Sequence, residues 1–207
     1  MGDYRIDPHL KDLEDKRRGM TLVIRFNQPV CERIAIFLKQ LATIEPQHYY
    51  YPEESFHLTL LSIISCSPEF DLGKINVDEY IPLIQKSLAV EEKPSFTFQG
   101  VTASPSSVMI QGFSNNDWLN KVRENLRINF KKSSLEQTID KRYVIQSAHA
   151  TVMRFANELS KKNEFIQALG KFRTYDFGSF EPRSVELVCN DWYHKKEHVQ
   201  VLHQFLI

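Results

Sequence analysis

The chain has 207 residues, of which 42% are hydrophobic and 25% are charged, and this composition excludes large-scale disorder. Its 26 basic and 26 acidic residues cancel, which excludes a surface that coats long polyanions. A nucleic-acid substrate would therefore be held by a local patch, and a small or terminal substrate is favoured.

The first part of the chain predicts an arm followed by a strand, a helix and a second strand. Residues 1–19 are charge-dense and predict a surface arm or short helix. Residues 21–26 are rich in β-branched and aromatic side chains and predict a strand, after which Asn27 and Pro29 suit the start of a helix. A near-continuous apolar run over 56–64 is typical of a covered central strand. The helix would bury a face at helical spacing, made of Val30, Ile34, Phe37, Leu38 and Leu41.

A second helix and a hairpin are expected next. Asn76 and Glu79 can form a capping pair, and Pro82 fits this helix only if it lies in the first turn. Residues 95–112 indicate two strands joined by a turn at 104–106.

The second half again combines helices with strands. A helix is predicted over 117–130, a loop over 131–140 and a strand within 143–155. Gly170 is expected to end a further helix. The remainder alternates in the manner of antiparallel strands over 174–180, 184–189 and 199–207. The halves together predict an α+β fold with an internal duplication and a cleft between two lobes.

Cysteine usage and the N-terminal sequence bear on the compartment. Cys31, Cys66 and Cys189 are scattered, which predicts buried free thiols in a reducing environment. The first residues are polar, and no stretch approaches the roughly 20 apolar residues that a membrane span requires. A cytoplasmic protein is expected.

One short pattern, Ser-x-His-x-Thr-apolar-apolar, occurs at 55–61 and again at 147–153. Side chains on a strand alternate between faces, so the histidine and threonine of each copy point the same way. Each half therefore offers one imidazole and one hydroxyl from a single strand face. These residues are His57 and Thr59 in the first copy, and His149 and Thr151 in the second.

Two imidazoles on opposite sides of a cleft suit in-line displacement at phosphorus. One can take a proton from the attacking hydroxyl while the other gives a proton to the departing oxygen, without a metal. The threonine hydroxyls can bind the non-bridging phosphate oxygens, where charge develops. The pattern thus predicts acid–base catalysis at a phosphate.

The paired His-x-Thr-apolar motifs resemble those of the 2H phosphoesterase superfamily, which includes bacterial 2′-5′ RNA ligase-like proteins and 2′,3′-cyclic phosphodiesterases. The likeness covers residues 21–207 in motif order and element order. It implies a bilobal α+β fold with the cleft between two antiparallel sheets, and metal-independent chemistry, without a cofactor, at 2′-linked or cyclic phosphates. It also implies a catalytic set made of His57, Thr59, His149 and Thr151.

Two flanking segments are candidates for substrate binding. Arg154 resembles the arginine after the second motif in the RNA ligase-like branch, but alternation puts it on the face opposite His149, so a structural salt bridge is favoured over phosphate contact. Tyr49 and Tyr51, with the tyrosine between them, can stack on a base, although core and rim packing is the favoured interpretation.

A third candidate segment lies near the C-terminus. Trp192 and Tyr193, followed by His194, come after an apolar strand and can form a cleft-rim loop that recognises nucleotide or phosphate. A solvated turn is the favoured interpretation. A metal site is not indicated, because only His194 and His198 have helical spacing and they lie where a turn enters a strand. Seven glycines without a glycine-rich phosphate loop disfavour ATP-driven ligation.

The leading expectation is a monomeric phosphodiesterase that opens 2′,3′-cyclic phosphates, or cleaves and reversibly joins 2′-5′ links, in RNA ends or small nucleotides. The arm at 1–19 would precede one bilobal domain over 20–207. The alternative is a non-catalytic module that binds an RNA end or a cyclic nucleotide. A third hypothesis, that the histidines are core residues, predicts burial of both strand faces. Ser55 and Ser147 on the histidine face argue for a wet cleft instead.

Overall fold

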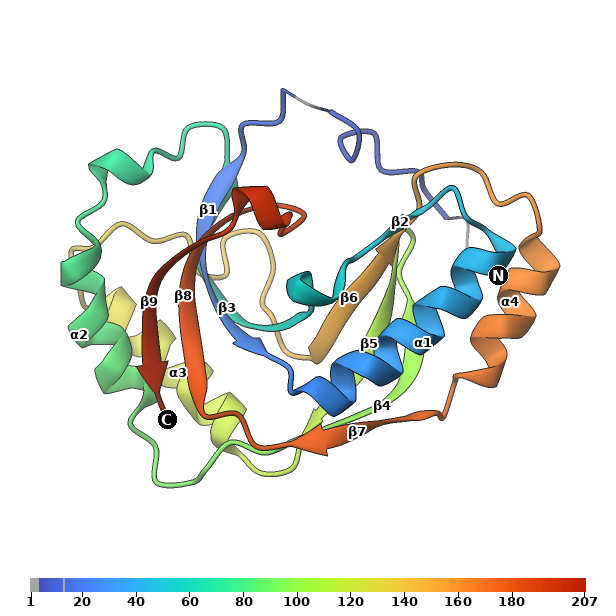
Figure 1. Ribbon diagram of the computed structural model, residues 1–207. Helices are drawn as coiled ribbons and strands as arrows, with labels where there is room; N and C mark the ends of the chain where they lie inside the picture. The colour runs from blue at the N-terminus through green and yellow to red at the C-terminus, as the bar shows by residue number, and fades with distance from the viewer. Residues whose placement is uncertain (1–3, 13) are drawn as a thin grey trace.

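The computed structural model describes residues 4–12 and 14–207 and contains two antiparallel sheets (Figure 1). The first sheet has the order β3-β1-β8-β9, and the second has the order β2-β6-β5-β4-β7. The first comprises β1 (Arg18–Arg25), β3 (His57–Ser67), β8 (Ser184–Asp191) and β9 (Gln200–Leu206). The second comprises β2 (Tyr49–Tyr50), β4 (Phe96–Ala103), β5 (Ser107–Ser114), β6 (Ala148–Arg154) and β7 (Asp176–Phe180). The predicted α+β class with two antiparallel sheets is confirmed.

Helices cover the outer side of each sheet (Figure 1). Helices α2 and α3 contact the first sheet, whereas α1 contacts the second sheet and α4 packs against α1. Because α1 follows β1 in the chain but packs on the other sheet, each lobe takes elements from both halves of the sequence. The helices are α1 (Gln28–Ile44), α2 (Val77–Leu88), α3 (Trp118–Lys131) and α4 (Lys162–Lys171).

The strands that carry the two motifs occupy equivalent places. In the spatial order across the first sheet, β3 is followed by β1, β8 and β9. Across the second sheet, β6 is followed by β5, β4 and β7. β3 and β6 belong to different sheets but lie side by side. The fold therefore brings together two motifs that are far apart in the sequence.

Helix α1 forms as its sequence predicts. The Asn27 side chain accepts a hydrogen bond from the Val30 backbone N–H at 3.2 Å, and Pro29 lies in the first turn, where its missing donor costs nothing. The predicted face is buried in the core, and it comprises Val30, Ile34, Phe37, Leu38 and Leu41.

Two helix predictions need correction. Pro82 lies inside α2 rather than in its first turn, and Asn76 donates to the Glu79 side chain at 2.8 Å instead of capping a backbone N–H. Gly170 lies within α4, which continues to Lys171, because this glycine keeps an ordinary helical backbone and does not adopt the left-handed conformation of a C-cap.

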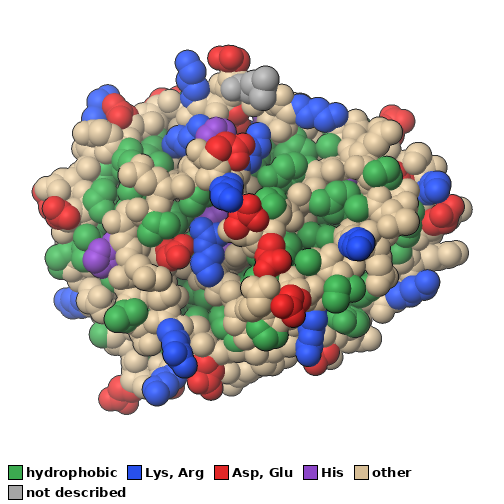
Figure 2. Space-filling view, in the orientation of Figure 1, with side chains coloured by type: hydrophobic (Ala, Val, Ile, Leu, Met, Phe, Trp, Pro, Cys, Tyr) green, Lys and Arg blue, Asp and Glu red, His purple; other side chains and the backbone are tan. Residues whose placement is uncertain are grey.

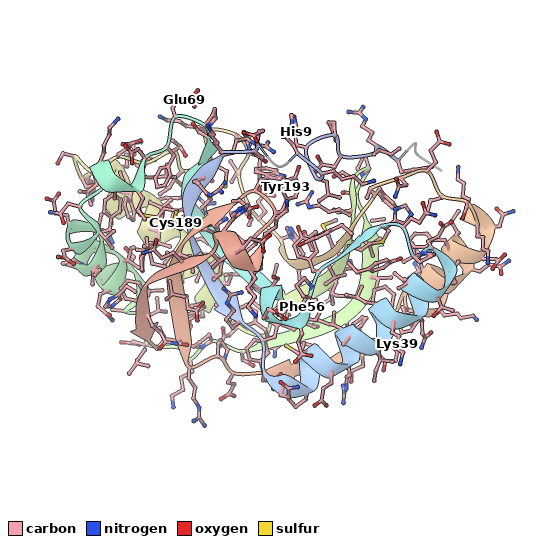
Figure 3. All side chains as sticks on the ribbon, turned by 45° about the horizontal axis from the view of Figure 1, so that its top comes forward. His9, Lys39, Phe56, Glu69, Cys189 and Tyr193 are labelled. Atoms are coloured by element: carbon pink, nitrogen blue, oxygen red, sulfur yellow. The ribbon has the colours of Figure 1, made fainter. Side chains whose placement is uncertain are left out.

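Residues 4–12 and 14–17, which precede β1, lie at the edge of the molecule where His9 and Tyr193 appear in Figure 3. The Tyr4 ring lies 5.2 Å from that of Phe155, and the Tyr193 hydroxyl donates to Asp7 at 2.8 Å. β1 begins at Arg18, slightly before the end of the expected arm.

Other sequence expectations can be compared with the structure. All three cysteines are buried and free, as predicted. No helix in the described part of the chain is long and apolar enough to cross a membrane. On the face shown in Figure 2, basic and acidic side chains are interspersed, in keeping with the neutral net charge.

The close approach of β1 and β3 depends on Gly19. A Cβ atom added there would lie 2.4 Å from the Ile64 carbonyl oxygen and 2.8 Å from the Cys66 nitrogen, both of which are backbone atoms. We therefore expect Gly19→Ala to lower the free energy of unfolding by about 2–3 kcal/mol, measured by urea titration. Gly170→Ala is the matched control, because nothing lies within 4 Å of its added Cβ. This helical substitution should stabilise by about 0.5–1 kcal/mol, and equal effects of the two changes would contradict the packing account.

Candidate active site

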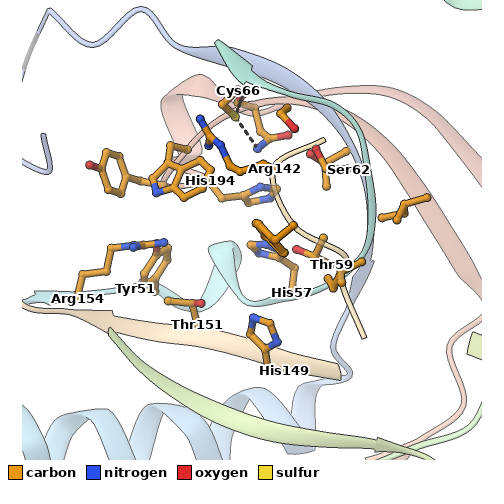
Figure 4. A pocket seen from close by; sticks show the side chains of 18 of the residues that line it. Tyr51, His57, Thr59, Ser62, Cys66, Arg142, His149, Thr151, Arg154 and His194 are labelled. Carbon is orange, nitrogen blue, oxygen red and sulfur yellow. Dashed lines mark hydrogen bonds between the residues drawn. The ribbon is translucent and has the colours of Figure 1, made fainter. Parts of the chain in front are cut away.

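A cavity of about 160 Å³ lies between the two lobes (Figure 4). β3 contributes His57 and Thr59 to its lining, and β6 contributes His149 and Thr151. Other lining residues include Tyr51, Ser62, Cys66, Arg142, Arg154, Trp192, Tyr193 and His194. The four residues of the repeated motif thus meet around one space.

Strand alternation accounts for this placement. In β6, His149 and Thr151 are partly exposed, whereas Ala148 and Ala150, which alternate with them, are buried. β3 shows the same alternation around His57. The hypothesis that both faces of the motif strands are buried is therefore wrong.

Each motif contains a β-bulge at the first apolar residue after its threonine. In the β1–β3 pairing Leu60 is an extra residue, and in the β5–β6 pairing Val152 is extra. An extra residue shifts the alternation by one position, so Ser62 and Arg154 return to the cavity face. The two consecutive apolar residues that end each motif are the sequence signal for this shift.

Arg154 lies in the cavity lining and is also part of a structural network. The argument that alternation turns it away from His149 is wrong, because the bulge at Val152 intervenes. Its Nε donates to the Tyr51 hydroxyl at 2.8 Å, and its Nη1 lies 3.7 Å from an Asp7 carboxylate oxygen. These contacts fix the guanidinium and partly balance its charge.

Each motif histidine is oriented through its Nδ1 atom. Nδ1 of His57 lies 2.7 Å from the Ser55 carbonyl oxygen, so it carries the proton and leaves Nε2 as the acceptor. Nδ1 of His149 lies 3.1 Å from the Ser147 hydroxyl, which can donate or accept. Ser55 itself is buried in a short 3₁₀ turn, so the expectation that it lines a wet cleft is wrong.

Burial keeps both histidines neutral in the unliganded protein. Desolvation lowers the pKa of His57 to about 4, against the opposing effect of the Ser55 carbonyl. The pKa of His149 is also lowered, first by burial and then by the positive charge of Arg123. Both imidazoles are therefore uncharged at pH 7.

Arg123 of α3 forms hydrogen bonds to both motif segments. Its side chain is almost completely buried, and it donates to four backbone carbonyls. Two belong to β3 and two to the residues just before β6: Leu60 at 2.8 Å, Thr59 at 3.2 Å, Gln146 at 3.1 Å and Ser147 at 3.0 Å. Sequence reasoning did not identify this residue, because α3 shows only that it is a polar position within an amphipathic helix.

The segment after β8 is more buried than the sequence suggests. Tyr193 and His194 are 1% and 3% exposed, so their interpretation as a solvated turn is wrong. Trp192 is partly exposed, and the Arg142 guanidinium lies 4.7 Å from its ring centre. His194 lines the cavity together with Trp192 and Tyr193 of the same candidate segment. Arg142 is a cavity residue that sequence reasoning did not select, and no motif marks it.

The tyrosine segment divides between the cavity and the surrounding packing. Tyr51 is buried and reaches the cavity, whereas Tyr49 does not line it. The two rings contact edge to face, with centres 5.0 Å apart. Among residues 4–12 and 14–207, no group of three or more His, Cys, Asp and Glu side chains is placed to hold a metal ion.

The Arg123 contacts predict a large cost for removing its guanidinium. Arg123→Met leaves four backbone carbonyls without this buried donor and should lower the free energy of unfolding by about 3–5 kcal/mol, measured by urea titration. Lys121→Met on the same helix is the control, because Lys121 pairs with Glu92 at the surface and its loss should leave the free energy of unfolding nearly unchanged. Similar losses in both variants would contradict the role given to Arg123.

The pKa of His57 predicts an acid-dependent loss of stability. The unfolded chain binds a proton at this residue below pH 6.5, whereas the folded chain does so only near pH 4, so stability falls as the pH drops through that interval. Between pH 7 and 4.5 this contribution is about 2 kcal/mol. His57→Gln should lose correspondingly less stability than the unmodified chain in urea titrations at the two pH values. An identical loss would show that His57 has an ordinary pKa.

Three solved structures have a fold similar to that of this chain. TT0787 of Thermus thermophilus has a TM-score of 0.61 at 18% identity, covering 91% of this chain and 97% of its own. E. coli LigT complexed with 3′-AMP has a TM-score of 0.58 at 14% identity, covering 92% and 98%. A protein described as a phosphoesterase has a TM-score of 0.57 at 11% identity, with the same coverage. No family model and no curated protein sequence matches the chain. The architecture that the two motifs imply is confirmed, and the chain shares the fold of TT0787, LigT and the phosphoesterase.

Proposed function

We propose that the protein is a metal-independent phosphodiesterase acting on 2′,3′-cyclic phosphates or 2′-5′ phosphodiester bonds of RNA ends or small nucleotides. The observation that carries this proposal is the convergence of two imidazoles and two hydroxyls, one of each from β3 and from β6, on one cavity. General acid–base displacement at phosphorus uses this set of groups.

The tautomer of His57 suits it to act as general base. With its Nδ1 proton held by Ser55, Nε2 can take a proton from water as the water oxygen forms a bond to phosphorus. His149 then gives its proton to the ribose oxygen as the bond from that oxygen to phosphorus breaks. The product is a phosphomonoester with a free neighbouring hydroxyl. With a ribose 5′-hydroxyl in place of water, the same two proton transfers would form a 2′-5′ link as the bond from phosphorus to the 3′ oxygen of the cyclic phosphate breaks.

Substrate binding would raise the pKa of His149, so that this residue takes up from solvent the proton that it needs. A phosphate carries negative charge into a cavity where burial lowers the pKa of both histidines, and a nearby anion raises the pKa of an imidazole. Thr59 and Thr151 are placed to donate to the non-bridging oxygens. Arg142 and Arg154 add positive charge at the cavity wall.

Three features support a small or terminal substrate. The cavity is small, and the face in Figure 2 has no continuous basic tract for a long polyanion. Solved structures of LigT with 3′-AMP and with phosphate show that a protein of this fold can hold such groups. These features favour a nucleotide end over the body of a polynucleotide.

Turnover assays of the four motif residues test the proposal. In buffer with EDTA, the protein should hydrolyse 2′,3′-cyclic AMP or a 2′-5′-linked diadenylate, with products followed by ³¹P NMR. His57→Ala and His149→Ala should each lower turnover by at least about a hundredfold, because each removes one proton transfer. Thr59→Val and Thr151→Val should each raise the barrier by about 2–4 kcal/mol, as loss of one oxyanion donor does.

Thr97→Val provides a matched control, since Thr97 lies on a strand of the second sheet and bonds to Asn115 and Ser179 away from the cavity. It should retain full activity. Full turnover in either histidine variant would refute the proposal. Tight calorimetric binding of 2′,3′-cyclic AMP without any product would favour the alternative, a module that binds nucleotides without catalysis.

A further inference from the structure

We propose that His194 is a substrate-binding residue that donates a hydrogen bond from its imidazole to an oxygen of the bound phosphate. This inference rests on the proposed function and assigns a third histidine to the same site. His194 lies outside both motifs, in the segment that follows β8.

The position of the His194 ring is the first observation. The ring stacks on that of His57, with centres 3.9 Å apart and planes inclined by 29°. It lines the same cavity, on the side where Arg142 also lies (Figure 4). Both rings line the cavity, one stacking distance apart. A phosphate close enough to use His57 therefore lies within reach of His194.

An unpartnered nitrogen is the second observation. His194 is 3% exposed, and its Nε2 has no hydrogen-bond partner among the described residues. Burying a polar atom without a partner is costly, and such atoms are rare in folded proteins. Burial lowers the pKa of His194, so the ring is neutral and carries one N–H. A phosphate oxygen would satisfy this donor.

The backbone of His194 is the third observation. Its φ of 54° is left-handed, which is uncommon for a residue other than glycine. Asp191 holds the turn: its carbonyl accepts from the His194 N–H at 3.2 Å, and its carboxylate accepts from the Lys195 N–H at 2.8 Å. His198 Nδ1 lies 3.1 Å from the second carboxylate oxygen. Strained residues held in place by several contacts are typical of functional sites.

Two substitutions separate ring stacking from hydrogen bonding. His194→Phe keeps an aromatic ring against His57 but removes the nitrogen, whereas His194→Asn keeps an N–H donor and tolerates the left-handed backbone. We expect His194→Phe to weaken binding of 2′-AMP about tenfold by calorimetry, as loss of one hydrogen bond to a charged group does. His194→Asn should recover part of that loss. Equal affinity of His194→Phe and the unmodified protein would overturn the proposal.

Imidazole ¹⁵N NMR of the unmodified protein gives a second readout that does not depend on folding of the Phe variant. The His194 signals, identified by their absence from His194→Asn, should shift with those of His57 and His149 as 2′-AMP or inorganic phosphate is added. Shifts at His57 and His149 with none at His194 would overturn this inference alone. Absence of any shift at the three residues would overturn the proposed function itself.

Discussion

The cavity depends on the buried guanidinium of Arg123. A planar group with five donors in a fixed geometry can bond to several carbonyls at once, and here it bonds to two from each motif segment. The motif strands belong to different sheets, so backbone hydrogen bonds of a shared sheet do not set their separation. Arg123 supplies polar contacts that tie them together. Burial lowers its pKa to about 10, which still leaves it charged at neutral pH.

The positive charge of Arg123 also affects the pKa of a motif histidine. Burial is the chief cause of the lowered pKa of both motif histidines, and at His149 the charge of Arg123 lowers the pKa further. An empty cavity with neutral imidazoles avoids burying unpaired imidazolium ions, which would be costly. An anionic phosphate that enters the cavity raises the pKa of the nearby imidazoles and favours a proton on one histidine. In the proposed mechanism, the site therefore acquires its general acid when the substrate binds.

The part of the structure that could be predicted from sequence is the part governed by local periodicity. The spacing of Val30, Ile34 and Phe37 predicts the buried face of α1, and alternation places His57 with Thr59 and His149 with Thr151. These patterns need only the geometry of one helix or one strand.

Predictions failed where the geometry is irregular or the contact is long-range. Arg154 was assigned to the wrong face because a bulge at Val152 changes the alternation. His194 was assigned to solvent because its buried conformation depends on a left-handed turn held by Asp191. The contacts of Arg123 join residues that only the folded chain brings together, so no local pattern indicates them.

The central claim is that His57 and His149 act on opposite sides of one phosphorus atom. A crystal structure with uridine vanadate, which adopts the trigonal-bipyramidal geometry of the displacement, measures this arrangement directly. The account predicts vanadate between the two residues, with Nε2 of each within about 2.6–3.2 Å of a different apical oxygen. Vanadate bound outside the cavity, or contacted by one histidine alone, would contradict it.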